Sequence, residues 1–467
     1  MKRRKLGTPI HPRDSSSSPA AGDPRRPRWV ILNCYGCGVP GEADGDRVIA
    51  DAKTVAESCT STGRHFVVSM GIAPPPAFSY LNHAMVGSAR SPVKYGDDTG
   101  FSRVVAAHRD SVLFLMTTKG GGTDYFVYDG ACASRRSLPR PPRLTLLPER
   151  QIPRRRHDDD DSVRALNLSD TGLLRRGDDE LLVAQLEAIT LREPRDTADL
   201  RVLRLGGRGG GGGGWELNKA VPIVQDHGGG KLHVLPDWWE AVAVIPVGDR
   251  YLCWLNYLAG LLVCDMADKA SHFKLRYVRL PAKLVGDYDD DYDYDEANGY
   301  TSSNDDDPPS MKYSRNMCAA GAGAVRLVSV DSRCCCGGRL RVRGGSRPST
   351  CKRSRFAFTV TTWTLKLRTM TWVQDGVWDC DELWRLPEYR NRNLPRVPLE
   401  YPVVSSDDPD VVCFRVRNDY SCYLDDEDRK VWLLEVDTRR KRLRSVIPTT
   451  IPYWKEDSDN IQTKFHC

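Results

Sequence analysis

Two groups of cysteines have spacings that can bind a metal or support redox chemistry. Cys34 and Cys37 form a Cys-x-x-Cys pair, and residues 334–336 are three successive cysteines with Cys351 further along the chain. A structural zinc site needs four ligands, but no second Cys-x-x-Cys or His-x-x-x-His pair follows Cys37. A redox pair would begin a helix near a βαβ unit, which the pattern does not contain. We therefore expect ordinary thiols and no metal site.

Several carboxylates gather in residues 405–410, directly before the apolar run 411–414. Two acids placed across a cleft catalyse glycoside hydrolysis, so Asp407 and Asp410 define a hydrolase as the alternative function. Neighbouring acids in front of a strand are far more often the solvated residues of a turn. The acidic segment 287–295 lacks the glycine and the final glutamate of a calcium loop. We therefore expect no catalytic residue in either segment.

The glycine-rich stretches do not match phosphate-binding loops, so no cofactor is expected. Residues 206–214 are nearly pure glycine and are followed by Trp215, where a P-loop continues with Gly-Lys-Ser/Thr. After residues 228–231, Leu232 stands at the position of the hydroxyl residue that binds magnesium. The nine histidines form no His-Glu-x-x-His motif, and no Gly-x-Ser-x-Gly turn is present.

Composition and charge limit the classes to which this protein can belong. Lys+Arg 68 against Asp+Glu 62 gives a net charge of only +6, and the charges are segregated into basic and acidic runs. No run of about 18 apolar residues exists, so no membrane span is expected. The basic start of the chain lacks the apolar segment of a secretion signal, which favours a cytoplasmic or nuclear protein whose cysteines are mostly reduced. Residues 2–5 are either a nuclear-import patch or part of a solvated tail.

The elements that would position any site are β-strands. Residues 238–281 contain apolar bursts rich in Val, Leu, Tyr and Trp, separated by Gly-Asp and Ala-Gly turns. β-Branched and aromatic residues favour strands, and Gly and Asp favour turns. Within this stretch Trp254 is expected to be buried in the middle of a strand. One short helix is expected at residues 50–58.

A similar hairpin pattern recurs along the chain, at residues 125–148, 200–217, 261–281, 356–373 and 431–448. Repeated hairpins without intervening helices are typical of a β-propeller, in which each blade packs on its neighbours. We therefore predict an all-β fold, an irregular propeller-like repeat of antiparallel hairpins. It would occupy residues 29–455, between a disordered basic tail at 1–28 and a C-terminal tail at 456–467. Disordered inserts are expected near 150–161, 206–214, 287–309 and 333–352.

These motifs together resemble a plant protein family, expanded in grasses, that is known only as domain of unknown function sixteen-eighteen. The resemblance covers most of the chain and is carried mainly by residues 254–265, 275–281, 361–372 and 401–414. Two positions depart from the usual central motif, where Asn256 replaces an acid and Ala259 replaces a base. The positions that form the structural signature are Trp254, Gly260, Cys264, Asp265, Pro281, Trp363, Trp372, Trp384, Pro402 and Asp408.

The resemblance implies a β-propeller similar to the regions that follow F-boxes in plant ubiquitin-ligase adaptors. It implies no catalytic residues, because the family has none assigned. We therefore expect a non-catalytic module that binds a protein partner and does not bind a membrane. Nucleic-acid binding through the arginines of residues 333–355 is a third, less favoured function. It would require these arginines to share one face with exposed aromatic side chains.

Overall fold

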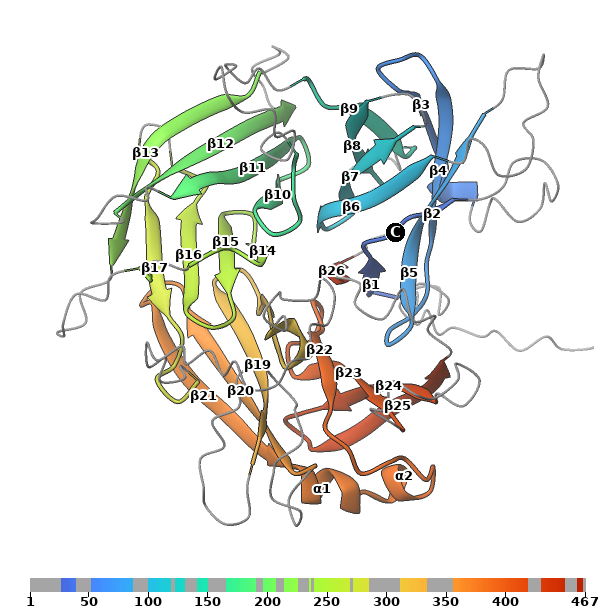
Figure 1. The fold of residues 1–467 in the computed structure, drawn as a ribbon, viewed down its shortest axis with the longest axis vertical. Helices are drawn as coiled ribbons and strands as arrows, with labels where there is room; N and C mark the ends of the chain where they lie inside the picture. Colours follow the sequence, from blue (N-terminus) through green and yellow to red (C-terminus); the bar gives the residue numbers. More distant parts are fainter. Residues whose placement is uncertain are drawn as a thin grey trace, which may run out of the picture.

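The computed structural model describes residues 27–38, 52–86, 100–118, 122–130, 141–149, 165–189, 196–206, 214–225, 235–236, 239–268, 272–284, 311–333, 356–418, 430–449 and 460–464. Over these residues the protein is nearly all β, as predicted (Figure 1). The two α-helices are short: α1 is Cys380–Arg385 and α2 is Pro387–Arg390. No helix within the described residues is long and apolar enough to span a membrane.

The strands form six units, here called blades 1 to 6, that follow one another around a centre (Figure 1). Blade 1 contains β1 (Trp29–Asn33), β2 (Cys37–Gly38), β3 (Ala56–Cys59), β4 (His65–Gly71), β5 (Phe78–Met85) and β26 (Asn460–Lys464). Blade 2 contains β6 (Phe101–His108), β7 (Ser111–Thr117), β8 (Thr123–Asp129) and β9 (Arg143–Leu146). Blade 3 contains β10 (Thr171–Arg176), β11 (Glu180–Ile189), β12 (Thr197–Gly206) and β13 (Glu216–Gln225).

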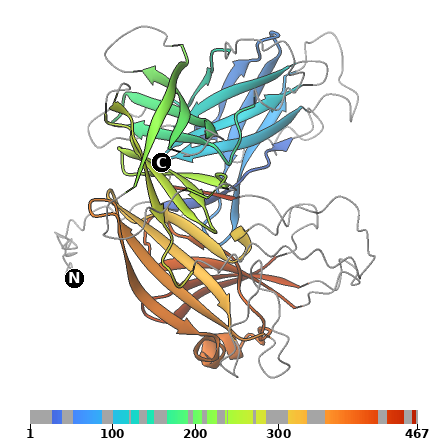
Figure 2. The ribbon, with the colours of Figure 1, turned by 60° about the vertical axis from the view of Figure 1, so that its left-hand side comes forward.

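Blade 4 contains β14 (Ala243–Val247), β15 (Tyr251–Asn256), β16 (Gly260–Asp265) and β17 (Leu275–Arg279). Blade 5 contains β18 (Arg315–Ala319), β19 (Ala324–Ser332), β20 (Phe358–Lys366) and β21 (Thr371–Asp379). Blade 6 contains β22 (Glu400–Val404), β23 (Val411–Arg417), β24 (Val431–Asp437) and β25 (Arg442–Thr449). Blades 3 and 4 share an eight-stranded sheet through a parallel pairing of β13 with β17. In Figure 2 the orange and red strands of blades 5 and 6 lie side by side.

Among the described residues, six hydrophobic clusters hold the blades together, one at each contact between neighbouring blades. Blades 3 and 4, 5 and 6, 4 and 5, 1 and 2, and 2 and 3 each share one cluster. The sixth cluster joins blade 1 to blade 6, with Trp29 and Ile31 packed against Val403 and Cys413. This contact closes the ring, so the architecture is propeller-like.

The C-terminal strand also takes part in the ring. β26 pairs antiparallel with β1, with Trp29 opposite Lys464. The predicted end of the domain at residue 455 is therefore wrong, because residues 460–464 of the expected tail form a strand. The tail lacks the long apolar run that identifies a core strand, and its pairing with β1 depends on a contact far away in sequence.

Packing on both sides of each blade explains the continuous apolar runs of the sequence. Cys253 and Leu255 belong to the cluster between blades 4 and 5, whereas Leu252 and Trp254 belong to the cluster between blades 3 and 4. Successive side chains of a strand point to opposite faces of the sheet, and here both faces are covered. A strand such as β15 therefore has no polar face.

The five hairpins predicted from sequence are confirmed as β8–β9, β12–β13, β16–β17, β20–β21 and β24–β25. They are the last two strands of blades 2 to 6. The helix predicted at residues 50–58 is wrong, because residues 52–58, the described part of the segment, contain the 3₁₀ turn Ala52–Thr54 and then most of β3. The inserts predicted near 150–161 and 287–309, and most of those near 206–214 and 333–352, lie outside the described residues.

Candidate functional site

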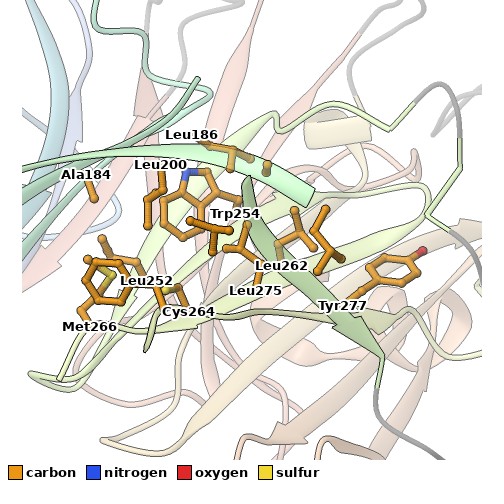
Figure 3. Packing of buried hydrophobic residues seen from close by; sticks show 14 of the residues in the cluster. Ala184, Leu186, Leu200, Leu252, Trp254, Leu262, Cys264, Met266, Leu275 and Tyr277 are labelled. Carbon is orange, nitrogen blue, oxygen red and sulfur yellow. The ribbon is translucent and has the colours of Figure 1, made fainter. Parts of the chain in front are cut away.

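Trp254, in β15, anchors blade 4 to blade 3. Its side chain is fully buried, as predicted, among leucines that include Leu200, Leu262 and Leu275 (Figure 3). The indole Nε1 donates a hydrogen bond of 2.7 Å to the backbone oxygen of Asp170, just before β10. Such an acceptor stabilises a buried indole N–H. Trp254 is therefore a structural residue that fixes the position of one blade against the next.

The signature residues of β16 also have structural roles. At Gly260 a Cβ atom would lie 2.2 Å from the backbone oxygen of Val278, so only glycine allows β16 and β17 to approach this closely. Burial raises the pKa of the Cys264 thiol to about 12, which keeps it protonated. Asp265 ends β16, where it accepts a hydrogen bond of 2.7 Å from Arg250 Nε.

The remaining signature residues pack or close turns. Pro281 accepts a backbone hydrogen bond of 2.8 Å from Leu284. Trp363 is buried between blades 4 and 5, and Trp372 Nε1 donates to the Arg279 oxygen at 2.9 Å. Trp384, in α1, makes an edge contact with Phe358 at 5.8 Å between ring centroids. Pro402 is buried in β22. The structure thus distributes the signature over blades 4, 5 and 6 instead of gathering it into one site.

The acids proposed for the alternative hydrolase lie in the turn between β22 and β23. The hydroxyl of Ser405 accepts the backbone N–H groups of Asp407 and Asp408, each at 3.1 Å. Asp408 in turn accepts the N–H of Asp410 at 3.2 Å. These bonds are typical of serine and aspartate side chains that stabilise a turn.

Each of these carboxylates is paired with arginine. Asp407 lies 4.0 Å from Arg28, and Asp408 lies 3.2 Å from Arg444. Asp410 pairs with the buried guanidinium of Arg326 in β19 and, at 3.7 Å, with Arg439. Arg326 also pairs with Asp375 of β21, so it connects blade 5 to blade 6. Asp410 therefore joins blade 6 to blade 5, whereas the Asp408–Arg444 pair lies within blade 6.

A buried charged cluster that sequence reasoning missed lies between blades 5 and 6. The Glu400 carboxylate, at the start of β22, is fully buried. It accepts hydrogen bonds of 3.1 Å from Arg415 Nε and from Arg417 Nε, and it also pairs with the hydroxyl of Tyr313. Tyr401, at φ 46°, places its ring 4.8 Å from that of Tyr313 and 4.2 Å from the Arg415 guanidinium.

The chemistry of this cluster favours an anchor over a catalyst. Burial and the negative charge of Glu400 raise the pKa of Tyr313, so the phenol stays protonated and acts as a donor. One carboxylate is shared by two guanidiniums and a phenol, so its oxygens are already occupied by donors within the protein. Tyr313 and Glu400 are 87 positions apart in sequence, and the only local signal was the spacing of Arg415 and Arg417 on one face of a buried strand.

A second group of possible metal ligands consists of Asp379, Cys380 and Asp381, whose ligand atoms lie within 4.8 Å of one another. Arg333 Nε lies 2.7 Å from Asp379, and Arg333 Nη2 lies 3.1 Å from Asp381. The guanidinium thus supplies the positive charge, and Asp379 also caps α1 by accepting the N–H of Asp381 at 2.8 Å. A structural role follows for all three acceptors.

The cysteine groups and the arginine-rich segment are only partly described. Cys34 is buried just after β1, and Cys37 begins the two-residue strand β2. Residues 334–336 and Cys351, together with the rest of the proposed nucleic-acid segment after Arg333, lie outside the described residues.

Asp170 is a partly buried acid at the contact between blades 3 and 4. Its Oδ1 accepts hydrogen bonds from the Thr171 hydroxyl at 2.8 Å and from Gln185 Nε2 at 3.1 Å. Its backbone oxygen accepts the indole of Trp254. Burial raises the pKa of this carboxyl above its ordinary value, although the hydrogen bonds oppose the shift.

Replacing Asp170 with asparagine should flatten the dependence of stability on pH. A folded-state pKa above the unfolded value means that the folded state holds the proton more tightly. The contribution of Asp170 is therefore fully present below the unfolded pKa and is lost as pH rises through the folded pKa. Relative to wild type, Asp170→Asn should gain stability from about pH 4 to about pH 7 in urea unfolding. A constant difference between the two proteins across this range would contradict the assignment.

Comparison with known proteins finds one matching family and two solved structures of low similarity. No curated protein matches the chain. Among solved structures, the WD40 domain of SCAP from fission yeast aligns with a TM-score of 0.31 and 8% identity, over 91% of this chain and 89% of that one. The subtype N11 neuraminidase-like protein of A/flat-faced bat/Peru aligns with a TM-score of 0.24 and 12% identity, over 91% of this chain and 98% of that one. Residues 254–413, which begin at Trp254 and end in β23, match the family described as "Protein of unknown function (DUF1618)".

Proposed function

We propose that the protein is a non-catalytic module whose propeller-like domain binds a protein partner. The observation that supports this most is the pairing of Asp407, Asp408 and Asp410 with arginines. A retaining or inverting glycosidase needs one carboxyl group that gives up a proton and a second that attacks or activates water. Acids engaged by guanidiniums in a turn are poorly placed for either step.

The buried cluster around Glu400 supports the same proposal. Arg415, Arg417 and Tyr313 all donate to this carboxylate, and Tyr313 is kept protonated. Charged groups arranged in this way stabilise the contact between blades 5 and 6. Function would then lie on the outer surface, where connecting loops of a rigid scaffold commonly carry binding residues.

The resemblance to propeller regions that follow F-boxes suggests one form of this function, a plant adaptor that presents another protein to a ubiquitin ligase. Such an adaptor would act in the cytoplasm or nucleus. It would also need an element that couples it to the ligase.

The test is affinity purification of the tagged full chain from its source tissue, followed by mass spectrometry and reconstitution with each purified candidate. We expect at least one protein that binds the purified chain directly. As a matched control for the hydrolase alternative, glycoside hydrolysis would be assayed for wild type and for Asp407→Asn/Asp410→Asn. Turnover by wild type that is lost in this variant, or the absence of any direct partner, would refute the proposal.

A further inference from the structure

The hairpin between β24 and β25 of blade 6 ends in four successive basic residues. Arg439, Arg440, Lys441 and Arg442 have side-chain exposures of 82%, 66%, 42% and 55%. The turn is fixed at its base, because the backbone N–H of Thr438 donates to the oxygen of Asp410 at 2.8 Å. A rigid, strongly basic tip is therefore present at the surface of this blade. It was not among the charge runs singled out from the sequence.

A buried carboxylate organises the guanidiniums of this tip. Asp437 has a side chain only 2% exposed and lies 3.2 Å from Arg440, 3.8 Å from Arg442 and 2.7 Å from Arg444. Its Oδ1 also accepts the backbone N–H of Arg440 at 2.8 Å. Burial opposes ionisation of Asp437, but the hydrogen bonds from Arg440 and Arg444 outweigh it and lower its pKa. Three guanidiniums thus share one buried negative charge and are held in place.

Arg439, Arg440 and Arg442 are each more exposed than the carboxylate with which they pair. Arg439 is 82% exposed, whereas its partner Asp410, 3.7 Å away, is 24% exposed and also pairs with Arg326. Lys441 pairs with Glu382 of α1 at 2.6 Å. An approaching molecule therefore meets the guanidiniums of Arg439, Arg440 and Arg442 before their carboxylates. Preorganised guanidiniums lose little entropy on binding carboxylates.

We propose that this basic tip, residues 439–444, is the surface on which an acidic segment of a protein partner docks. The inference rests on the proposed function and adds the chemistry of the partner to it. Two exposed acids beside the tip favour a protein over a nucleic acid as the partner. Glu382 is 47% exposed and Asp408 is 46% exposed, and both lie beside the tip. A continuous phosphate backbone would be repelled by them, whereas separate carboxylates of a protein can fit between charges of alternating sign.

The test uses Arg439→Ser/Arg442→Ser in the full chain. These residues make the longest ion pairs of the tip, 3.7 and 3.8 Å, so their loss should leave the fold intact. The matched control is Lys366→Ser/Arg368→Ser. It removes the same charge from exposed residues at the equivalent hairpin, β20–β21 of blade 5. Thermal unfolding of all three proteins shows whether the variants fold as wild type does.

Fluorescein-labelled poly-L-glutamate is the probe, and its binding is measured by fluorescence anisotropy. We expect wild type to bind it, with affinity that falls between about 50 and about 200 mM NaCl. The tip variant should bind about tenfold more weakly, and the control variant should bind as wild type does. Equal binding by all three proteins, no binding by wild type, or tighter binding of a DNA duplex than of poly-L-glutamate would overturn the proposal.

The same variants separate this inference from the proposed function. If a reconstituted partner binds the tip variant as well as wild type, the protein is a binding module and the docking surface lies elsewhere. If no protein binds wild type directly, the proposed function itself fails.

Discussion

Replacing Trp254 with alanine is expected to lower the free energy of unfolding by about 3–5 kcal/mol. The side chain is fully buried between blades 3 and 4, and its loss would leave a large cavity lined by leucines. The backbone oxygen of Asp170 would also lose its indole donor. Urea unfolding of the full chain measures the change. Such a loss is a large fraction of the stability of a typical domain.

A second substitution at Trp254 separates packing from hydrogen bonding. Trp254→Phe keeps most of the apolar volume but removes the N–H donor, so a smaller loss of about 1–3 kcal/mol is expected. If alanine and phenylalanine were equally destabilising, the hydrogen bond to Asp170 would dominate over packing. Unfolding of Trp254→Ala at the wild-type denaturant concentration would show that the residue does not support the contact between the blades.

The burial of Trp254 was predictable because it depends on local pattern. Apolar residues around Trp254, cut by Gly-Asp and Ala-Gly turns, identify a strand, and five hairpins of the same design identify a repeat. The number of blades was not predictable. The hairpins of blade 1, β3–β4 and β4–β5, are not among these five, and the blade is completed by the distant strands β1 and β26.

The partners of the charged side chains could not be predicted from the sequence, because they lie in distant parts of the chain. From the local sequence alone, Asp407 and Asp410 can be interpreted as catalytic acids, because their neighbours are also acids. Their partners Arg28 and Arg326 come from other blades. The Glu400 cluster joins residues 87 and 104 positions apart. Hydrophobic periodicity reports which face of a strand is buried, but it carries no information about which blade lies against that face.

Replacing Glu400 with glutamine is expected to destabilise the protein by about 3–5 kcal/mol. Glutamine keeps the shape of the side chain but removes its charge, and Arg415, with a side chain 6% exposed, would lose its buried counter-ion. A buried charge without a partner is costly, because water cannot replace the lost carboxylate. Urea unfolding at neutral pH measures the effect.

Asp265→Asn is the matched control for this substitution. Asp265 also pairs with an arginine, Arg250, but that guanidinium is 53% exposed and water can solvate it after the charge is lost. Exposed pairs of this kind contribute about 1 kcal/mol or less. The double variant Glu400→Gln/Arg417→Gln should recover part of the loss, because one of the two positive charges around Glu400 is removed together with the negative one. Equal effects of Glu400→Gln and Asp265→Asn would mean that the Glu400 cluster is solvated and does not anchor blade 6 to blade 5.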